Sequence, residues 1–353
     1  MPATALVDWE DAALLAGRLA RPGPAVTRDE AQDLVASLRG AAERAVEPVL
    51  DITAMAPADG RDLDTAQLSD VLVVDRAGWA RAAARSMRDM TDDVLVLPSG
   101  ASPAVAAQVA ASAEIGAALA FLSTKILGQF DPYSAQEPGR LLLVAPNVLH
   151  VERELGVRPA DFRLWVALHE QTHALQFAAA PWLATHLQER TRALVRGMSA
   201  TSGLRDVPPR LAALVRALYR ALRGVEGASL VDGILTREQQ VELDAITAVM
   251  SLLEGHADVA MDAVGPRLVP SVRSIRRKFE KRRDTSGAAD GVVKRLLGMD
   301  AKLAQYRDGA AFVRGVTRDV GTAGFNAVWT DSAALPTAHE IADPTAWVRR
   351  VHG

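Results

Sequence analysis

Two histidines one helical turn apart are the residues of this sequence best suited to chemistry. Residues 169–173 read His-Glu-Gln-Thr-His, which matches the pattern H-E-x-x-H. Residues i and i+4 share one face of a helix, so His169 and His173 can direct ring nitrogens at one ion about 2 Å away. Glu170 is displaced around the helix but can still reach a water molecule at that ion. The spacing predicts a metal site with an acid–base group beside it; the alternative is two histidines with ordinary hydrogen bonds.

A catalytic zinc ion needs a third protein ligand as well as an open position for water. The chain has no cysteine, so His, Asp or Glu must supply that ligand. Residues 252–258 read Leu-Leu-Glu-Gly-His-Ala-Asp and place two carboxylates four residues apart in an apolar stretch. We predict Glu254 as the ligand, with Asp258 accepting the remaining N–H of a ligand histidine. His256 is the second choice of ligand and Asp258 the third, and a solvated acidic helix face is the alternative for the whole segment.

The reaction that such a site could support is hydrolysis. Zinc would lower the pKa of its bound water toward about 7 and polarise a carbonyl group. Glu170 could take the water proton and later pass it to a leaving amine. A tetrahedral oxyanion would need a further donor. The sequence leaves this donor open among Tyr133, Tyr219, Tyr306, His256, His339 and several arginines.

Helices must position most of these groups. An apolar helix over Ala160–Ala179 carries the first motif, between Pro159 and Pro181. Capping boxes that begin at Thr27 and Thr236 start two further helices, which we expect to run to about residues 46 and 264.

The remaining elements are expected from apolar patterning and from breaks at Pro and Gly. Arg140–Ala145 is the clearest strand, and Val71–Val74 is an apolar run of uncertain type. Further helices are expected near residues 77–90, 102–128, 147–155, 182–198, 210–223, 301–320 and 324–329.

The composition is that of a folded, mainly helical protein. Of 353 residues, 49% are apolar, 24% are charged and only 5% are aromatic, which favours closely packed helices. We expect a mainly α (α+β) fold, with a helical core, a small β-sheet and additional N- and C-terminal helices. The expected regions are 1–95 (N-terminal helical), 96–268 (metal-binding core) and 269–353 (C-terminal helical), packed as one compact unit.

Charge and hydropathy argue against nucleic acid and membrane partners. The net charge is −3, and the basic stretch at residues 273–283 is interpreted as a solvated helix face. Ser102–Phe130 is apolar but consists mostly of Ala and Ser with Glu114 near its middle, so we expect a buried helix there. The first twenty residues lack the basic start of a signal peptide, and the absence of cysteine suits a reducing cytoplasm. We therefore expect a cytoplasmic protein.

The two motifs together resemble the gluzincin branch of zinc metallopeptidases, in which H-E-x-x-H is followed by E-x-x-x-D. The resemblance implies His169, His173 and Glu254 as zinc ligands, Glu170 as general base and Asp258 as support for a ligand histidine. The chain also resembles an actinobacterial zincin-like family of uncharacterised proteins, often labelled as associated with biosynthesis of a deazaflavin cofactor. That resemblance is carried by residues 127–132 (Leu-Gly-Gln-Phe-Asp-Pro), residues 144–147 (Val-Ala-Pro-Asn), the metal motif and residues 325–329.

A zincin-like core and a zinc-dependent hydrolase are what this resemblance implies, in particular a metallopeptidase in which zinc-bound water is activated by Glu170. The substrate would be a peptide or protein, held in extended form against the strand Arg140–Ala145. The alternative is a catalytically silent zincin-like protein that acts as a binding or assembly factor. Glu254 lies about eighty residues after His173, much further than in the best-known gluzincins, so the intervening helices must bring it back.

Overall fold

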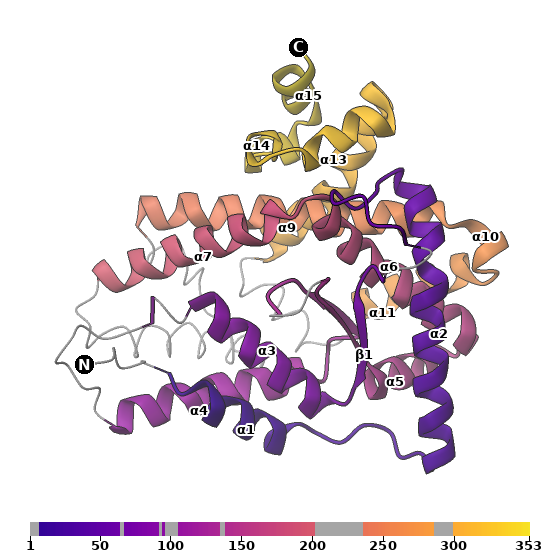
Figure 1. Ribbon diagram of the computed structural model, residues 1–353, viewed down its shortest axis with the longest axis vertical. Coiled ribbons are helices and arrows are strands. Elements are labelled where there is room, and N and C mark those ends of the chain that lie inside the picture. Colours follow the sequence, from indigo (N-terminus) through magenta and orange to yellow (C-terminus); the bar gives the residue numbers. More distant parts are fainter. Residues whose placement is uncertain are drawn as a thin grey trace.

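The computed structural model describes residues 7–63, 67–91, 94–95, 105–134, 138–201, 236–285 and 299–353 (Figure 1). Its helices are α1 (Trp9–Leu19), α2 (Arg28–Thr53), α3 (Arg76–Thr91), α4 (Val105–Leu122), α5 (Ala145–Leu155), α6 (Pro159–Ala179), α7 (Trp182–Thr201), α9 (Arg237–Ala263), α10 (Gly265–Leu268), α11 (Val272–Thr285), α13 (Met299–Phe325), α14 (Ala338–Ala342) and α15 (Pro344–His352). Two short 3-10 helices, η1 (Asn326–Trp329) and η2 (Ser332–Ala334), follow α13. The expected mainly α fold with a small sheet is confirmed.

In the part of the chain that the structure describes, the sheet has three strands in the order β1-β3-β2. β1 (Asp70–Val74) is parallel to β3 (Arg140–Val144), and β2 (Gly128–Asp131) is antiparallel to it. The predicted strand at Arg140–Ala145 therefore exists, but its predicted role as the substrate-binding edge is wrong. Its unbroken apolar run is typical of a strand whose two faces are both buried, and its two neighbouring strands occupy both of its edges.

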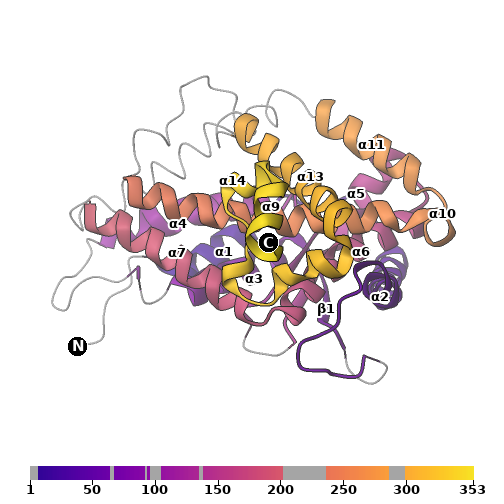
Figure 2. The same ribbon diagram turned by 90° about the horizontal axis from the view of Figure 1, so that it is seen from above.

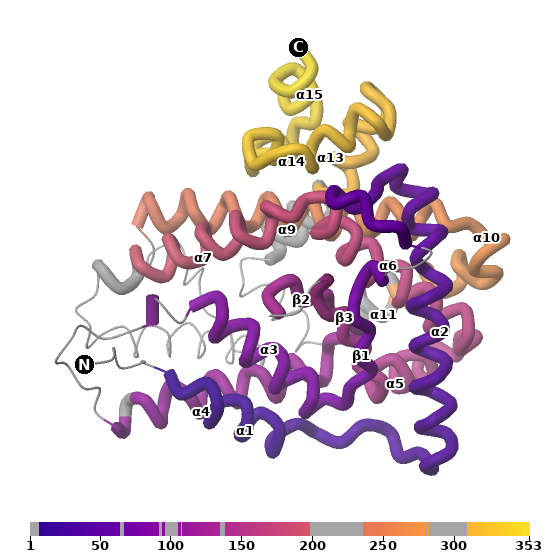
Figure 3. The backbone as a smooth tube through the Cα atoms, in the orientation of Figure 1, coloured from indigo at the N-terminus to yellow at the C-terminus, as the bar shows by residue number. Residues whose placement is uncertain are grey.

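The central strand divides the core into two halves. Leu141 and Leu143 belong to the larger hydrophobic cluster, with residues of α2, α6 and α9, whereas Leu142 and Val144 belong to a second cluster with residues of α1, α3 and α4. Successive strand residues point to opposite faces of a sheet, so this alternation follows from strand geometry. Figure 3 shows the strands between these two helical layers.

The helix that carries the first motif, α6, is buried around most of its circumference. Phe162, Leu168 and Leu175 are at most 1% exposed, and α2, β2 and α9 pack around the helix. Pro159 stands in its first turn, where proline does not remove a needed N–H donor. A helix buried in this way gives its side chains fixed positions, as a metal site requires.

The two predicted capping boxes are both present, at Thr27 with Glu30 and at Thr236 with Gln239. Helix α9 ends within one residue of its predicted end, but α2 continues through Pro48 to Thr53 instead of stopping near residue 46. Buried Val49 lies directly beyond Pro48 and belongs to the larger cluster. We infer that packing of α2 against α6 compensates for the hydrogen bond that Pro48 cannot make.

Other predictions met mixed outcomes. Val71–Val74 forms most of β1, and residues 77–90 and 182–198 lie in α3 and α7. Residues 324–329 form the end of α13 and then a 3-10 turn, instead of one α-helix. The helix start at Ser102-Pro103 and the helix at residues 210–223 fall outside the described residues. The division into three regions stays a prediction, although residues of all three meet in the larger cluster.

The Ala-rich apolar helix α4 packs along α1 in the smaller cluster (Figure 1). Among the described residues, no helix is long and apolar enough to cross a bilayer.

The C-terminal helices hold α9 in place from the opposite side to α6. Figure 2 looks down on α13 and α14, which both pack on α9. The contact between α13 and α9 is made through glycines. A Cβ atom on Gly255 would lie 2.2 Å from the carbonyl carbon of Gly309, and one on Gly309 would lie 2.0 Å from the carbonyl oxygen of Ser251. These backbones can approach so closely only because both positions lack side chains.

We therefore expect Gly309→Ala to destabilise the protein by roughly 1–3 kcal/mol or more, because the added methyl group must push α13 away from α9. Urea unfolding would measure the change. The matched control is Gly40→Ala in α2, where a Cβ would meet only Arg44 Nη1, at 3.4 Å. That variant should gain about 0.5–1 kcal/mol, as expected for Gly to Ala inside a helix. Equal effects at the two positions would contradict the close crossing.

Candidate metal centre

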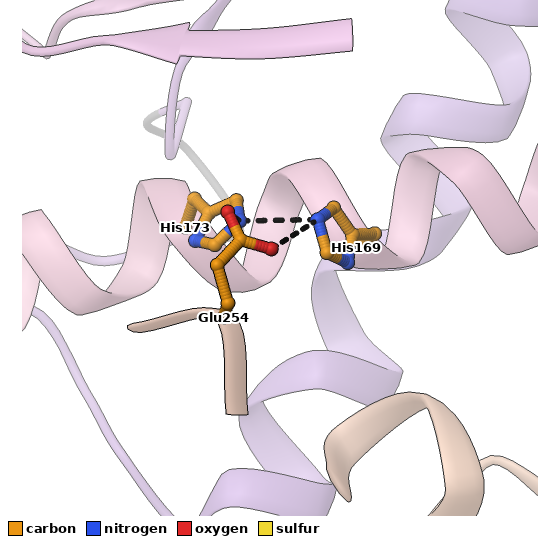
Figure 4. A group of neighbouring side chains, drawn as sticks. All are labelled: His169, His173 and Glu254. Carbon is orange, nitrogen blue, oxygen red and sulfur yellow. Dashed lines mark hydrogen bonds and ion pairs between the residues drawn. The ribbon is translucent and has the colours of Figure 1, made fainter. Parts of the chain in front are cut away.

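The two motif histidines face one another on α6. Their Nε2 atoms are 3.1 Å apart, and their ring centroids are 4.6 Å apart with the rings nearly perpendicular. Figure 4 shows both rings turned toward the same point beside the helix. The predicted convergence of His169 and His173 is thus present in the fold.

Glu254 approaches the same point from α9. Its Oε2 atom lies 3.6 Å from His169 Nε2, and its Oε1 atom lies 3.7 Å from His173 Nε2 (Figure 4). One ligand atom from each of the three residues lies within 4.8 Å of the others. The long separation in sequence is overcome because α9 packs directly against α6.

This donor set fits a divalent cation of the zinc type. Two imidazole nitrogens and a carboxylate are a common ligand set of catalytic zinc. Bonds of about 2.0–2.1 Å at tetrahedral angles would separate ligand atoms by roughly 3.3–3.4 Å. The two Nε2 atoms are 3.1 Å apart, and each lies 3.6–3.7 Å from a different oxygen of Glu254, so small side-chain shifts would bring one oxygen to that distance from both rings. The Glu254 side chain is 39% exposed, so solvent reaches one side of the group.

Glu170 is buried next to this group, between α6 and β2. It is 5% exposed, and its pKa is raised well above 4.5, mainly by burial and then by the negative charge of Glu254. A Cβ atom on Gly128 would lie only 2.7 Å from Glu170 Oε1. Glycine in β2 is therefore what makes room for the carboxyl group. Within the described parts of the chain, that carboxyl group makes no hydrogen bond of its own.

His256 and Asp258, the alternatives for the third ligand, do not belong to the group formed by His169, His173 and Glu254. His256 is 5% exposed, and its ring packs 5.2 Å from the ring of Phe325 and 5.3 Å from that of Trp329. Asp258 pairs with Arg276 of α11 at 3.5 Å.

Asp258 was predicted to accept the remaining N–H of a ligand histidine. At His173 a different residue accepts that N–H. Nδ1 of His173 lies 2.8 Å from Oε1 of Gln176, and Nδ1 of His169 lies 3.2 Å from the sulfur of Met261. Gln176 was missed by the sequence analysis, although it stands three residues after His173 and thus on the same helix face. A role for Asp258 near His169 stays a prediction.

Two of the candidates for an oxyanion donor, Tyr133 and His339, make their described contacts or lie exposed elsewhere. The hydroxyl of Tyr133 faces the carbonyl oxygen of Ala184 at 3.5 Å, and burial followed by the charge of Asp131 raises its pKa to about 12. His339 lies exposed on α14. Tyr219 and the side chain of Tyr306 fall outside the described structure.

Two buried groups, Glu170 and His256, and the partly buried His169 should make the stability of the zinc-free protein depend on pH. Burial, followed by the nearby charge of His173, lowers the pKa of His169 from 6.5 to about 4 and that of His256 to about 3. Between these values and about 6.5, the unfolded chain binds the two protons and the folded chain does not, so acidification favours unfolding. Glu170 acts in the opposite direction, because its raised pKa means that the folded chain holds this proton more tightly than the unfolded chain does. Its stabilising contribution to the free energy of unfolding is therefore present at low pH and is lost as the pH rises.

On acidification below about pH 6.5, two histidines act against one carboxyl group, so the free energy of unfolding should fall, by on the order of 1 kcal/mol per pH unit near pH 5. Urea titrations of zinc-free protein across this range would measure the slope. Glu170→Gln should steepen it, and His256→Gln should flatten it. Identical slopes in all three proteins would contradict the assignment.

Comparison with known proteins defines the class. The chain belongs to the zincin-like metallopeptidase family, which matches residues 7–348. The chain is also similar to a Chloroflexus aurantiacus protein whose crystal structure is described as "a putative hydrolase with a novel fold". The identity is 29%, the TM-score is 0.66, and the match covers 98% of each chain. No curated protein matches it. The family implies a metal, typically zinc, and together with the structural neighbour it indicates a hydrolase.

Proposed function

We propose that this protein is a zinc-dependent peptidase in which His169, His173 and Glu254 hold the metal and Glu170 is the general base. The observation that carries the proposal is the convergence of these three ligands, within 4.8 Å of one another, beside a buried carboxyl group. A purely structural metal site has no use for an acid–base group at this position.

The environment of Glu170 suits proton transfer near neutral pH. A general base works best when its pKa lies near the working pH. Burial raises the pKa of Glu170 in that direction, and a cation held by Glu254 and the histidines would offset part of the rise. Bound zinc would supply Lewis-acid polarisation of the scissile carbonyl and a lowered pKa for the attacking water. Glu170 would take one proton from that water and deliver it to the leaving amine nitrogen, which leaves the carboxylate ready for another cycle.

The substrate would lie along β2 instead of along β3. β3 is paired on both sides, whereas β2 has one edge that no described strand covers. β2 begins at Gly128, against Glu170, so a peptide added to its outer edge would pass the proposed base. We propose an extended peptide or protein segment as the substrate, and cytoplasmic action, which a chain without cysteine suits.

Arg276 and Asp258 complete the surroundings of His169. The positive charge of Arg276 contributes to the lowered pKa of His169, after burial and His173. We propose that Asp258 supports the site by holding Arg276, through the 3.5 Å ion pair, so that this charge stays in place.

The test is hydrolysis of fluorogenic peptide libraries by protein loaded with one equivalent of zinc. Activity should disappear on treatment with a zinc chelator and return when zinc is restored. Tight zinc binding with no cleavage of any peptide or amide would sink the peptidase proposal and favour the silent binding protein. Failure to bind zinc at all would sink both.

A further inference from the structure

We infer that Gln176 and His256 form a hydrogen-bonded relay that fixes which nitrogen of His173 is free to bind a metal, and that anchors this ligand to the C-terminal segment. The inference concerns positioning residues and rests on the proposed function for its meaning, since it assumes that His173 is a metal ligand.

The first step is the orientation of the Gln176 amide, which is fully buried. Its Nε2 atom lies 3.0 Å from the carbonyl oxygen of Leu253. A carbonyl oxygen can only accept, so the atom facing it must be the amide NH2 group. The other end of the amide is therefore the oxygen, and it is this oxygen that lies 2.8 Å from His173 Nδ1.

The second step is the tautomer of His173. Because Gln176 Oε1 is an acceptor, Nδ1 of His173 must carry the proton and donate it. The neutral ring has only one N–H, so Nε2 keeps its lone pair. That nitrogen is the one that faces His169 and Glu254. The buried amide thus holds the ring in the form that can bind a cation, and prevents rotation of the ring away from the site.

The third step is the extension to His256. The second hydrogen of the Gln176 amide points to Nδ1 of His256, 3.0 Å away, so this nitrogen accepts. The His256 ring is in turn held against Phe325 and Trp329, at the end of α13 and in η1. One continuous set of contacts therefore links a ligand on α6 to residues about 150 positions later in the chain.

His256 is thus a support for the ligand set and not a member of it. Its removal should loosen one of the two donor contacts of the Gln176 amide, whereas the bond to Leu253 would remain. The C-terminal helices would contribute to metal affinity without touching the ion.

The experiment compares Gln176→Leu with Gln171→Leu. Gln171 lies on the same helix, is 2% exposed, and also makes two buried hydrogen bonds, to Ser69 and to the carbonyl oxygen of Ala42. It therefore controls for the loss of a buried amide in α6. Chelator competition should show zinc bound roughly 10–100-fold more weakly by Gln176→Leu, with Gln171→Leu unchanged from wild type. His256→Leu should show a smaller loss, and His256→Gln, which keeps an acceptor, should restore affinity.

A second readout needs neither zinc nor turnover. Long-range proton–nitrogen NMR of histidine-labelled, zinc-free protein should show His173 as the Nδ1–H tautomer in wild type and in Gln171→Leu, and as a mixture in Gln176→Leu. An Nε2–H tautomer in the wild type, or zinc affinity of Gln176→Leu within about two-fold of wild type, would overturn the relay. Because the tautomer is measured without metal, its outcome is separate from whether the protein is a peptidase.

Discussion

Replacing Glu170 by Gln is expected to lower kcat/KM for peptide hydrolysis by roughly 10²–10⁴-fold while the protein still binds one zinc per chain. The range is that typical of a positioned general acid–base group. Gln has the same shape but cannot accept a proton from water. None of the three converging ligand atoms belongs to Glu170, so metal binding should survive. Steady-state kinetics and metal analysis of the same preparation would measure both effects.

Stability gives this prediction its control. Glu170 is buried without a hydrogen bond among the described residues, and burial penalises its charged form. Gln at this position should therefore leave the free energy of unfolding unchanged or raise it slightly near neutral pH. If activity and stability fell together, the loss would report misfolding; if activity persisted, Glu170 could not be the base.

The parts of the fold that followed from sequence were those encoded within a few residues. The capping boxes at Thr27 and Thr236 are local hydrogen-bond patterns, and the spacing of His169 and His173 is a property of one helix. Glu254 could be predicted because a carboxylate in an apolar stretch needs a partner. Each of these inferences depended on a single segment.

The predictions that failed, and the residues that were missed, depend on contacts between segments. The pairing of β2 with β3 decides which strand is an edge, and neither strand carries that information alone. Gln176 looked like one polar residue in an apolar helix, because its partners Leu253 and His256 lie on another helix. The role of Gly128 depends on how closely β2 approaches Glu170, which no periodicity reveals.

The other large effect concerns the third ligand, for which the chain offers three neighbouring candidates. Glu254→Ala should weaken zinc binding by more than the roughly 10–100-fold that is typical when a partner of a ligand is lost, because it removes a ligand itself. Asp258→Asn should have a small effect, since Asp258 pairs with Arg276 at the exposed rim. His256→Gln should also retain zinc.

Thermal unfolding separates these outcomes without an activity assay. A ligand that binds only the folded state stabilises it by about 2.7 kcal/mol when present at 100 times its dissociation constant. Wild type, Asp258→Asn and His256→Gln should therefore share a zinc-dependent rise in Tm, and Glu254→Ala should lose it at the same zinc concentration. The comparison isolates the ligand because the carboxylate is 39% exposed, so its truncation leaves little cavity in the core. The opposite result would be a full zinc-dependent rise in Tm for Glu254→Ala and the loss of that rise for His256→Gln. It would mean that three histidines hold the ion and that the ligand on α9 lies on a different face of the helix.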